Sequence, residues 1–418
     1  MIKGIVSSIR HNIRADFLTC IIGLYALAMV IPPLPFLLPV YYLILVALFI
    51  YMLFCGGKIN GYNASFIIAA VISIVVSNPP AIFRSWERLG LLIIVMGATS
   101  SLFRSPTGTV LTFKLLQVTL WLFAGVGIIS FACYLLGINY MQMWDGGEDI
   151  FASAGGFGGI TQQSMILGPL SAFGAIFLTC KLLYGHFQKN TKTFFWISVA
   201  LCCISTLLSA SRSALLCLLL GLVMVLYFRF KNISGKFFKN IVLAIAVLTL
   251  SYPLYSGFAQ GVITKQQANE ASGGTFSSRD VKWTNRIAEF EKSPLFGIGF
   301  ASISLDTEEG GMTNRTGVVE PGSSWLAVLS MTGLLGAIPI ALLLICTLFR
   351  LLKKIRIQAN YNFVILFVLL FVCIVHQFFE GYALAGGSYL CFFFWLLLGA
   401  ADSYGRQSIT NPNVDFNL

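Results

Sequence analysis

Long hydrophobic runs make up most of the chain, and polar residues separate them only briefly. Each run is near the roughly 20 residues that an α-helix needs to cross a bilayer. The runs predict about twelve membrane-spanning helices, at about 17–34, 36–55, 63–77, 86–103, 111–137, 162–184, 193–209, 211–228, 238–256, 324–349, 361–378 and 384–401. One polar stretch, 258–324, is too long to be a connector. We therefore expect an all-α polytopic membrane protein, a single membrane domain over 1–418, with 258–324 as one large loop between the ninth and tenth helices.

Charged residues give the expected orientation. Only 10% of the residues are charged, against about 25% in soluble domains. If both termini are cytoplasmic, that side holds most of the 27 Lys and Arg residues but only three acidic residues, Asp16, Asp402 and Asp415. This is the positive-inside bias of membrane proteins. It places the large loop outside, and it makes the net charge of +11 a mark of topology rather than of nucleic-acid binding.

Metal and cofactor chemistry find no support in the residue pattern. The ten cysteines lie in or at the ends of the apolar runs, and the three histidines (His11, His186 and His376) form no cluster with them. A zinc site needs such a cluster, and a nucleotide site needs a phosphate-binding motif that is missing here. We expect no metal, no cofactor and no disulfide framework.

The large loop contains a predicted helix. Ser277 and Asp280 have the spacing of a helix start, and Pro294 predicts the end. Between them an apolar stripe recurs at helical spacing: Val281, Trp283, Ile287 and Phe290. The polar side would carry Arg279, Lys282, Arg286 and Lys292. Such a side is often simply a solvated face, so the pattern by itself predicts only a short amphipathic helix.

Three arginines outside this helix lie on the same expected side of the membrane. Arg212 stands between two apolar runs, where an unpaired charge costs several kcal/mol. It is either functional, or a helix-end residue that reaches for water or pairs with Glu380. Arg84 and Arg88 are four residues apart and flank Trp86, so they form either part of a site or an ordinary interfacial belt. The planar guanidinium group of arginine matches the geometry of phosphate oxygens. The three arginines and the cations of the loop helix together are the kind of site that a diphosphate would need.

Several short motifs resemble the O-antigen ligase and polymerase superfamily. They are Gly158-Gly-Ile-x-Gln-Gln-Ser-x-x-Leu-Gly168, Ser211-Arg212-Ser-Ala-Leu-Leu, Ser278-Arg279-x3-Trp283, Ser293-Pro-Leu-Phe-Gly-Ile-Gly-Phe300, Glu320-Pro-x3-Trp-Leu326 and Thr332-Gly-Leu-Leu-Gly336. Their order, and the large loop before the tenth helix, also match. The resemblance implies a metal-independent inverting glycosyltransferase with a GT-C-like fold, in the bacterial inner membrane with its loop in the periplasm.

The resemblance also implies substrates and residue roles. The donor would be a glycan on undecaprenyl diphosphate, and the acceptor a glycan or glycolipid. Membrane lipids and a chain-length regulator are the other expected partners. Arg212 and Arg279 match the family's positions for holding the diphosphate. The wider set expected to bind diphosphate or glycan adds Arg84, Arg88, Arg286, Trp283 and Gln163.

One departure from the family pattern bears on the reaction. Ligases of the family usually carry a histidine after the Glu-Pro pair, and this chain has Gly322 there. The difference favours a polymerase of O-antigen, capsule or exopolysaccharide over a ligase that transfers the glycan to lipid A–core or another acceptor. A polysaccharide transporter or flippase is a further alternative. A general base would come from Glu320 first, and from Glu380 or His376 second. Glu320 is equally explained as a carboxylate that stabilises the start of the tenth helix. We expect Arg212 and Arg279 to converge in one cavity with Arg84 or Arg88.

Overall fold

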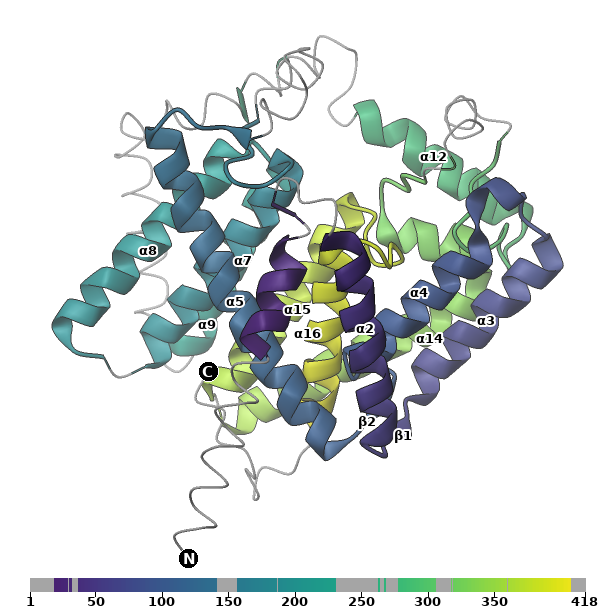
Figure 1. Ribbon diagram of the computed structural model, residues 1–418, viewed down its shortest axis with the longest axis horizontal. Coiled ribbons are helices and arrows are strands. Elements are labelled where there is room, and N and C mark those ends of the chain that lie inside the picture. The colour runs from purple at the N-terminus through teal and green to yellow at the C-terminus, as the bar shows by residue number, and fades with distance from the viewer. Residues whose placement is uncertain are drawn as a thin grey trace, which may run out of the picture.

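The computed structural model describes residues 19–28, 30–31, 37–140, 156–185, 187–230, 262–263, 267, 277–305, 317, 319–358 and 360–406. Within these ranges the chain is almost entirely helical (Figure 1). A first helix covers Thr19–Ala28. The others are α2 (Leu37–Phe54), α3 (Gly61–Ser77), η1 (Ala81–Phe83), α4 (Ser85–Ala98), α5 (Pro106–Leu135), α7 (Ser164–Tyr184), α8 (Lys189–Leu208), α9 (Arg212–Phe230), α12 (Ser277–Lys292), α14 (Ser324–Ile357), α15 (Tyr361–Phe379) and α16 (Tyr389–Arg406). The strands β1 (Lys58–Ile59) and β2 (Phe103–Arg104) pair antiparallel.

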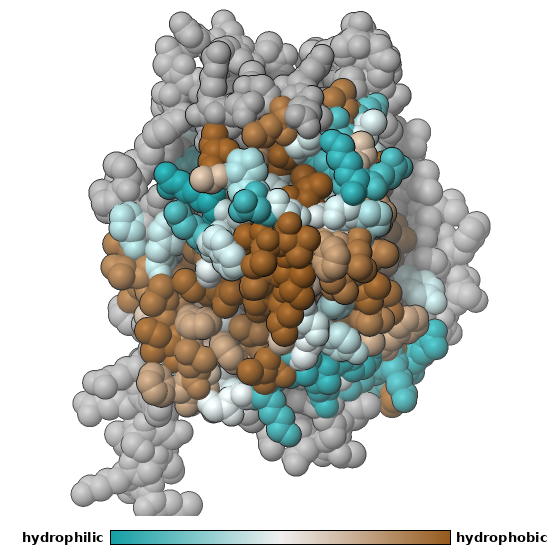
Figure 2. Space-filling model, turned by 90° about the vertical axis from the view of Figure 1, so that its right-hand side faces the viewer, coloured by the Kyte–Doolittle hydropathy of each residue, from teal (hydrophilic) through white to brown (hydrophobic). Residues whose placement is uncertain are grey.

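The helices confirm a polytopic membrane protein. Among the described residues, six are long and apolar enough to cross a membrane, by length and composition: Gly108–Leu135, Ser164–Tyr184, Lys189–Leu208, Arg212–Phe230, Ser324–Ile357 and Tyr361–Phe379. Helices also form at the other expected spans, except that 238–256 lies outside the described residues. Figure 2 shows a hydrophobic band across one face, with hydrophilic residues above and below it. That distribution suits a body surrounded by lipid.

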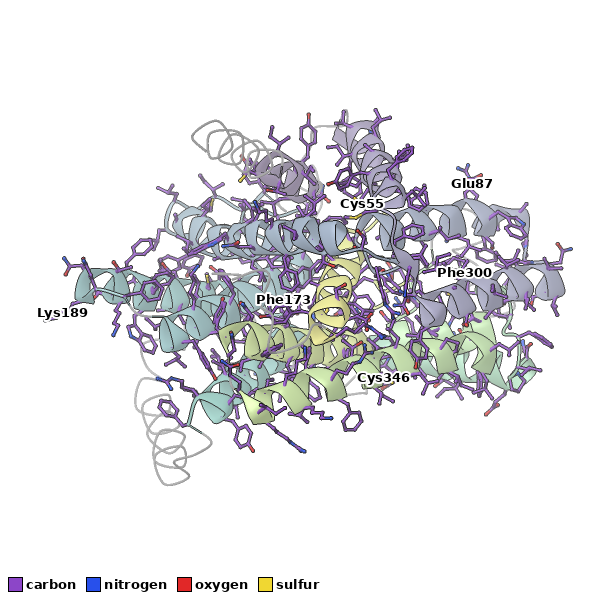
Figure 3. The ribbon with its side chains drawn as sticks, turned by 90° about the horizontal axis from the view of Figure 1, so that it is seen from below. Cys55, Glu87, Phe173, Lys189, Phe300 and Cys346 are labelled. Carbon is purple, nitrogen blue, oxygen red and sulfur yellow. The ribbon has the colours of Figure 1, made fainter. Side chains whose placement is uncertain are left out.

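The centre of the bundle is formed by α7, α15 and α16. Helix α7 packs against α5, α8 and α9, while α15 packs against α9, α14 and α16. Phe173 of α7 is fully buried near the middle of the molecule (Figure 3). Its ring contacts those of Phe123, Phe393 and His376, with centroids 5.2 to 6.3 Å apart. Helix α9 packs against this centre, and the start of α9 and the end of α15 contribute to the site.

Helix α14 is broken at Gly333, and the segment after α12 fills the break. Gly333 has φ 59° and ψ −163°, far from helical values. The N–H groups of Leu334 and Leu335 donate to the carbonyls of Pro294 and Leu295, at 2.9 and 3.3 Å. The carbonyl of Met331 accepts from Ser73 Oγ of α3 at 2.6 Å. Lipid offers no hydrogen bonds to freed backbone groups, so protein must supply them.

This packing fixes the position of α12, which lies at the end of the bundle opposite the β1–β2 ribbon (Figure 1). Ile298 N donates to Ser330 O at 2.8 Å, and Ser77 Oγ of α3 donates to Gly297 O at 2.8 Å. A Cβ at Gly297 would lie 2.4 Å from the backbone carbon of Met331. The turn that follows α12 is therefore held directly by α14 and α3.

We expect Gly333→Ala to destabilise the protein. Its φ and ψ lie in a region that is essentially restricted to glycine, which costs an alanine about 1–3 kcal/mol. A Cβ there would also lie 2.3 Å from the carbonyl oxygen of Leu295. The midpoint of thermal unfolding in detergent should fall. The matched control is Gly90→Ala in α4, where a Cβ meets no atom within 4 Å. Equal midpoints for the two variants would contradict this account of the break.

At the opposite end of the bundle, one carboxylate joins three elements. Asp402 of α16 is buried and pairs with Arg104 of β2 at 2.8 Å, with Arg350 of α14 at 2.9 Å and with Arg406 at 3.2 Å. Thr347 Oγ1 donates to it at 3.3 Å. These three guanidinium groups are thus bound to the fold, and β2, which carries Arg104, lies at the end of the bundle away from α12 (Figure 1).

Candidate active site

A cavity of about 810 Å³ opens beside α12. Its walls come from the start of α7, the start of α9, α12, the segment 319–322 and the loop between α15 and α16. The charged residues that line it are Arg212, Arg279, Lys282, Glu320 and Glu380. The structure therefore brings Arg212 and Arg279 into one cavity, as the sequence predicted. Three cations and two carboxylates share a space large enough for a diphosphate with sugars attached.

Glu380 is the meeting point of three elements. It follows the last residue of α15, forms an ion pair with Arg279 of α12, and accepts from Ser213 Oγ of α9 at 3.3 Å. Burial raises the pKa of the Glu380 carboxyl, while Arg279 and Ser213 favour its charged form. Its backbone carbonyl accepts from Ser324 N at 3.1 Å and from Ser324 Oγ at 2.8 Å. Both its main chain and its carboxylate are thus held in place.

Lys282 and Glu320 form a second ion pair in the cavity. Lys282 Nζ lies 2.6 Å from Glu320 Oε2, and the Glu320 side chain is 73% exposed. Helix capping does not explain Glu320, because the N-cap of α14 is Ser323, whose Oγ accepts from Leu326 N. Glu320 lies three residues before this cap and lines the cavity.

Helix α12 packs against the segment 320–322. Trp283 Nε1 donates to the carbonyl of Gly322 at 3.3 Å, and the Trp283 ring packs near that of Phe379. Gly322 has φ 70°, and a Cβ there would lie 2.9 Å from Cβ of Lys282. The stem of Lys282 therefore occupies the space that a side chain at position 322 would need.

Arg286 was expected on the polar face of the loop helix, and this expectation was wrong. Its side chain is fully buried and pairs with Glu289, three residues later, at 2.8 Å. Glu289 Oε1 also accepts from Ser304 N at 2.7 Å. The pair lies between α12 and the segment that follows it, and Arg286 does not line the cavity. It holds α12 in place rather than facing a substrate.

Arg84 and Arg88 do not join the cavity, contrary to the expectation. Arg84 lies before α4 with φ 49°, so the two residues do not share a helix face as their spacing predicted. Arg84 is exposed and pairs with Glu87 at 3.7 Å. Arg88 donates to the carbonyls of Gly317 at 2.6 Å and Ala301 at 3.5 Å. These contacts tie Arg88 to the backbone of the segments after α12.

Of the other expected site residues, some line the cavity and some do not. Gln163 precedes α7 and lines the cavity. Trp283 does not line it, and its Nε1 donates to the carbonyl of Gly322. His376 is buried in α15, where its Nδ1 lies 3.1 Å from the hydroxyl of Tyr382, and it does not reach the cavity.

The sequence interpretation missed part of the wall. The loop 380–388 contributes Gly381, Tyr382, Ala385 and Ser388, because α16 begins only at Tyr389. The expected last span, 384–401, includes residues 384–388, because hydrophobicity alone does not separate them from the helix. The signal was present in the run Gly381-Tyr-Ala-Leu-Ala-Gly-Gly-Ser388, since glycine and serine at this density favour a loop.

Of two comparisons with known proteins, one finds a match. A search of curated proteins gives no match. The family model described as O-antigen ligase, Wzy_C, matches residues 197–341. The matched segment contains Arg212, Arg279, Lys282 and Glu320, while Glu380 lies beyond it. The match confirms that this chain resembles the O-antigen ligase and polymerase superfamily.

Proposed function

We propose that the chain is a glycosyltransferase that polymerises glycan repeat units carried on undecaprenyl diphosphate. The observation that carries this proposal is the cavity beside α12, where Arg212, Arg279 and Lys282 meet two carboxylates in a membrane protein. A polyprenyl donor stays in the bilayer and presents its diphosphate at the membrane surface. Cations at one end of the helix bundle suit such a substrate. In this proposal the protein lies in the bacterial inner membrane and the cavity faces the periplasm.

The proposed chemistry is a direct displacement. Arg212 and Arg279 hold the diphosphate, which is the leaving group. A carboxylate accepts the proton of the acceptor hydroxyl, whose oxygen bonds to the anomeric carbon. The bond from that carbon to the diphosphate oxygen breaks, and its electron pair leaves with the polyprenyl diphosphate. The configuration inverts, and the arginines stabilise the developing negative charge. No metal is needed, because the leaving diphosphate is neutralised by side chains.

Glu320 is the first candidate for the base and Glu380 the second. The Glu320 side chain is mostly exposed, so an acceptor can reach it. Glu380 is held by Arg279 and Ser213, which leaves its Oε1 less available. A base must come within hydrogen-bond reach of the hydroxyl that it deprotonates.

The geometry at Gly322 supports a polymerase rather than a ligase that uses a histidine there. A histidine at this position would adopt a positive φ and would meet the stem of Lys282. The ligase remains the second candidate function because the matching family model is described as O-antigen ligase.

Deletion of the gene separates the two candidates. Loss of a polymerase should leave single repeat units, either on their acceptor or on the lipid carrier, with no long chains. Loss of a ligase should leave long chains on undecaprenyl diphosphate and a bare acceptor. Gel analysis of the acceptor fraction and of the carrier-linked fraction distinguishes the patterns. Full-length polymer stranded on the carrier would exclude the polymerase and establish the ligase.

A further inference from the structure

Both cations that α12 sends into the cavity are paired with a carboxylate from another segment. Arg279 pairs with Glu380, and Lys282 with Glu320. The two cations are three residues apart, so they lie on one face of the helix. A diphosphate that enters this cavity must therefore compete with carboxylates for the same cations.

The two ion pairs differ in how firmly they are held. The Glu380 side chain is 16% exposed and has a second donor in Ser213. The Glu320 side chain is 73% exposed, and the contact described for it is the one with Lys282. Exposed ion pairs contribute only about 0.2–1 kcal/mol. A diphosphate therefore replaces Glu320 as the partner of Lys282 more easily than it replaces Glu380 as the partner of Arg279.

The Lys282 side chain is anchored along its stem and able to turn at its tip. The stem packs over Gly322, with Cβ, Cγ and Cδ of Lys282 within 3.6 Å of the position of a Cβ there. Trp283, the next residue, holds the Gly322 carbonyl. The ammonium is a compact charge with three donors on rotatable bonds. It can exchange one acceptor for another without movement of α12.

From this arrangement we infer that Lys282 is a third diphosphate-binding cation, and that Glu320 is its counter-ion only while the site is empty. The inference rests on the proposed function and deepens it. When the diphosphate binds, the Lys282 ammonium leaves the Glu320 carboxylate for a phosphate oxygen. Glu320 is then free to accept the proton of the acceptor hydroxyl. Binding of the donor thus releases Glu320 to act as the base. A donor that lacks its second phosphate should release Glu320 less completely.

The competition predicts that removing the Glu320 charge strengthens diphosphate binding. The probe is farnesyl diphosphate, titrated calorimetrically into the full chain purified in detergent. Glu320→Gln should bind it about two- to fivefold more tightly, the factor that corresponds to an exposed ion pair. Lys282→Met, which keeps the stem over Gly322, should bind it more weakly. In the double variant the gain from Glu320→Gln should disappear, because the two changes share one interaction.

Asp280 provides the matched control for bulk charge. It lies on α12 two residues before Lys282, is exposed, and does not line the cavity. Asp280→Asn removes one negative charge and should not tighten binding. The inference is overturned if Asp280→Asn tightens binding as much as Glu320→Gln, or if the gain persists in the Lys282→Met background. Lys282→Gln replaces the methionine variant if the latter does not accumulate.

Turnover adds a second and separate readout. With a lipid-linked repeat unit as substrate, Glu320→Gln should lower both KM for the donor and kcat, whereas a merely structural defect would not lower KM. If the wild-type chain binds no farnesyl diphosphate, the proposed function itself fails. If the wild type binds it and Glu320→Gln leaves the affinity unchanged, only the exchange of Lys282 between Glu320 and phosphate fails.

Discussion

Replacing Arg212 with alanine is expected to stop elongation of the polysaccharide while the protein still accumulates in the membrane. Arg212 begins α9 and lines the cavity together with Arg279. Removing one preorganised donor to a developing negative charge typically lowers kcat by roughly 100- to 1000-fold. Arg212→Lys should restore activity only in part, because an ammonium lacks the forked geometry of the guanidinium.

Polymer length on gels, in a deletion strain that carries each variant, measures the effect. The amount of each variant in the membrane must be measured in parallel, so that lost activity is not confused with lost protein. Lys292→Ala is the matched control, because Lys292 is an exposed cation at the end of α12 outside the cavity wall. Normal polymer length with Arg212→Ala would refute the assignment of this residue to the site.

The second large effect is expected from Arg286→Ala, and it should appear in stability. Arg286 and Glu289 are both buried, with 0% and 2% of their side chains exposed. Removing one partner of a buried ion pair takes that contact away from the charge that stays buried, and breaking such a pair costs about 3–5 kcal/mol. The unfolding midpoint of the purified protein should fall, and less of it should accumulate in the membrane.

A second Arg–Glu pair in the chain serves as the control for the effect of burial. Arg84 and Glu87 have the same residue types at the same spacing, but both side chains are 72% exposed. Arg84→Ala should change stability little, since solvent screens an exposed pair. The double variant Arg286→Met/Glu289→Met should recover part of the lost stability, because it removes both buried charges. A midpoint for Arg286→Ala equal to that for Arg84→Ala would contradict the burial argument.

These two pairs also show where sequence reasoning reached its limit. Both read as Arg-x-x-Glu, with nothing local to tell them apart. Burial of Arg286 depends on residues 293–304 folding back against α12, which is a tertiary event. The short helix itself could be predicted, because its start, apolar spacing and following proline are local signals.

For the charged residues of the cavity, too, local signals could be predicted and long-range partners could not. Arg212 and Arg279 could be predicted as neighbours, because a cation beside apolar helix is costly and both lie in motifs that resemble one superfamily. The pairing of Arg279 with Glu380 joins residues 101 positions apart, and no pattern in the sequence selects that partner. Arg84 and Arg88 do not reach the cavity because Arg84 pairs with Glu87 and Arg88 donates to the carbonyls of Ala301 and Gly317. The contacts of Arg88 join residues more than 200 positions apart, and no pattern in the sequence selects them.

The broken turn of α14 sets a rule for exchanging the outer segment between relatives. The segment after α12 supplies the carbonyls that complete the helix at Leu334 and Leu335, and the α3 hydroxyls of Ser73 and Ser77 complete the same junction. A graft that ended at the membrane surface, before Ser324, would separate these groups from the helix that they complete. Transplants meant to alter sugar specificity should therefore extend past Gly336 and carry both serines of α3 with them.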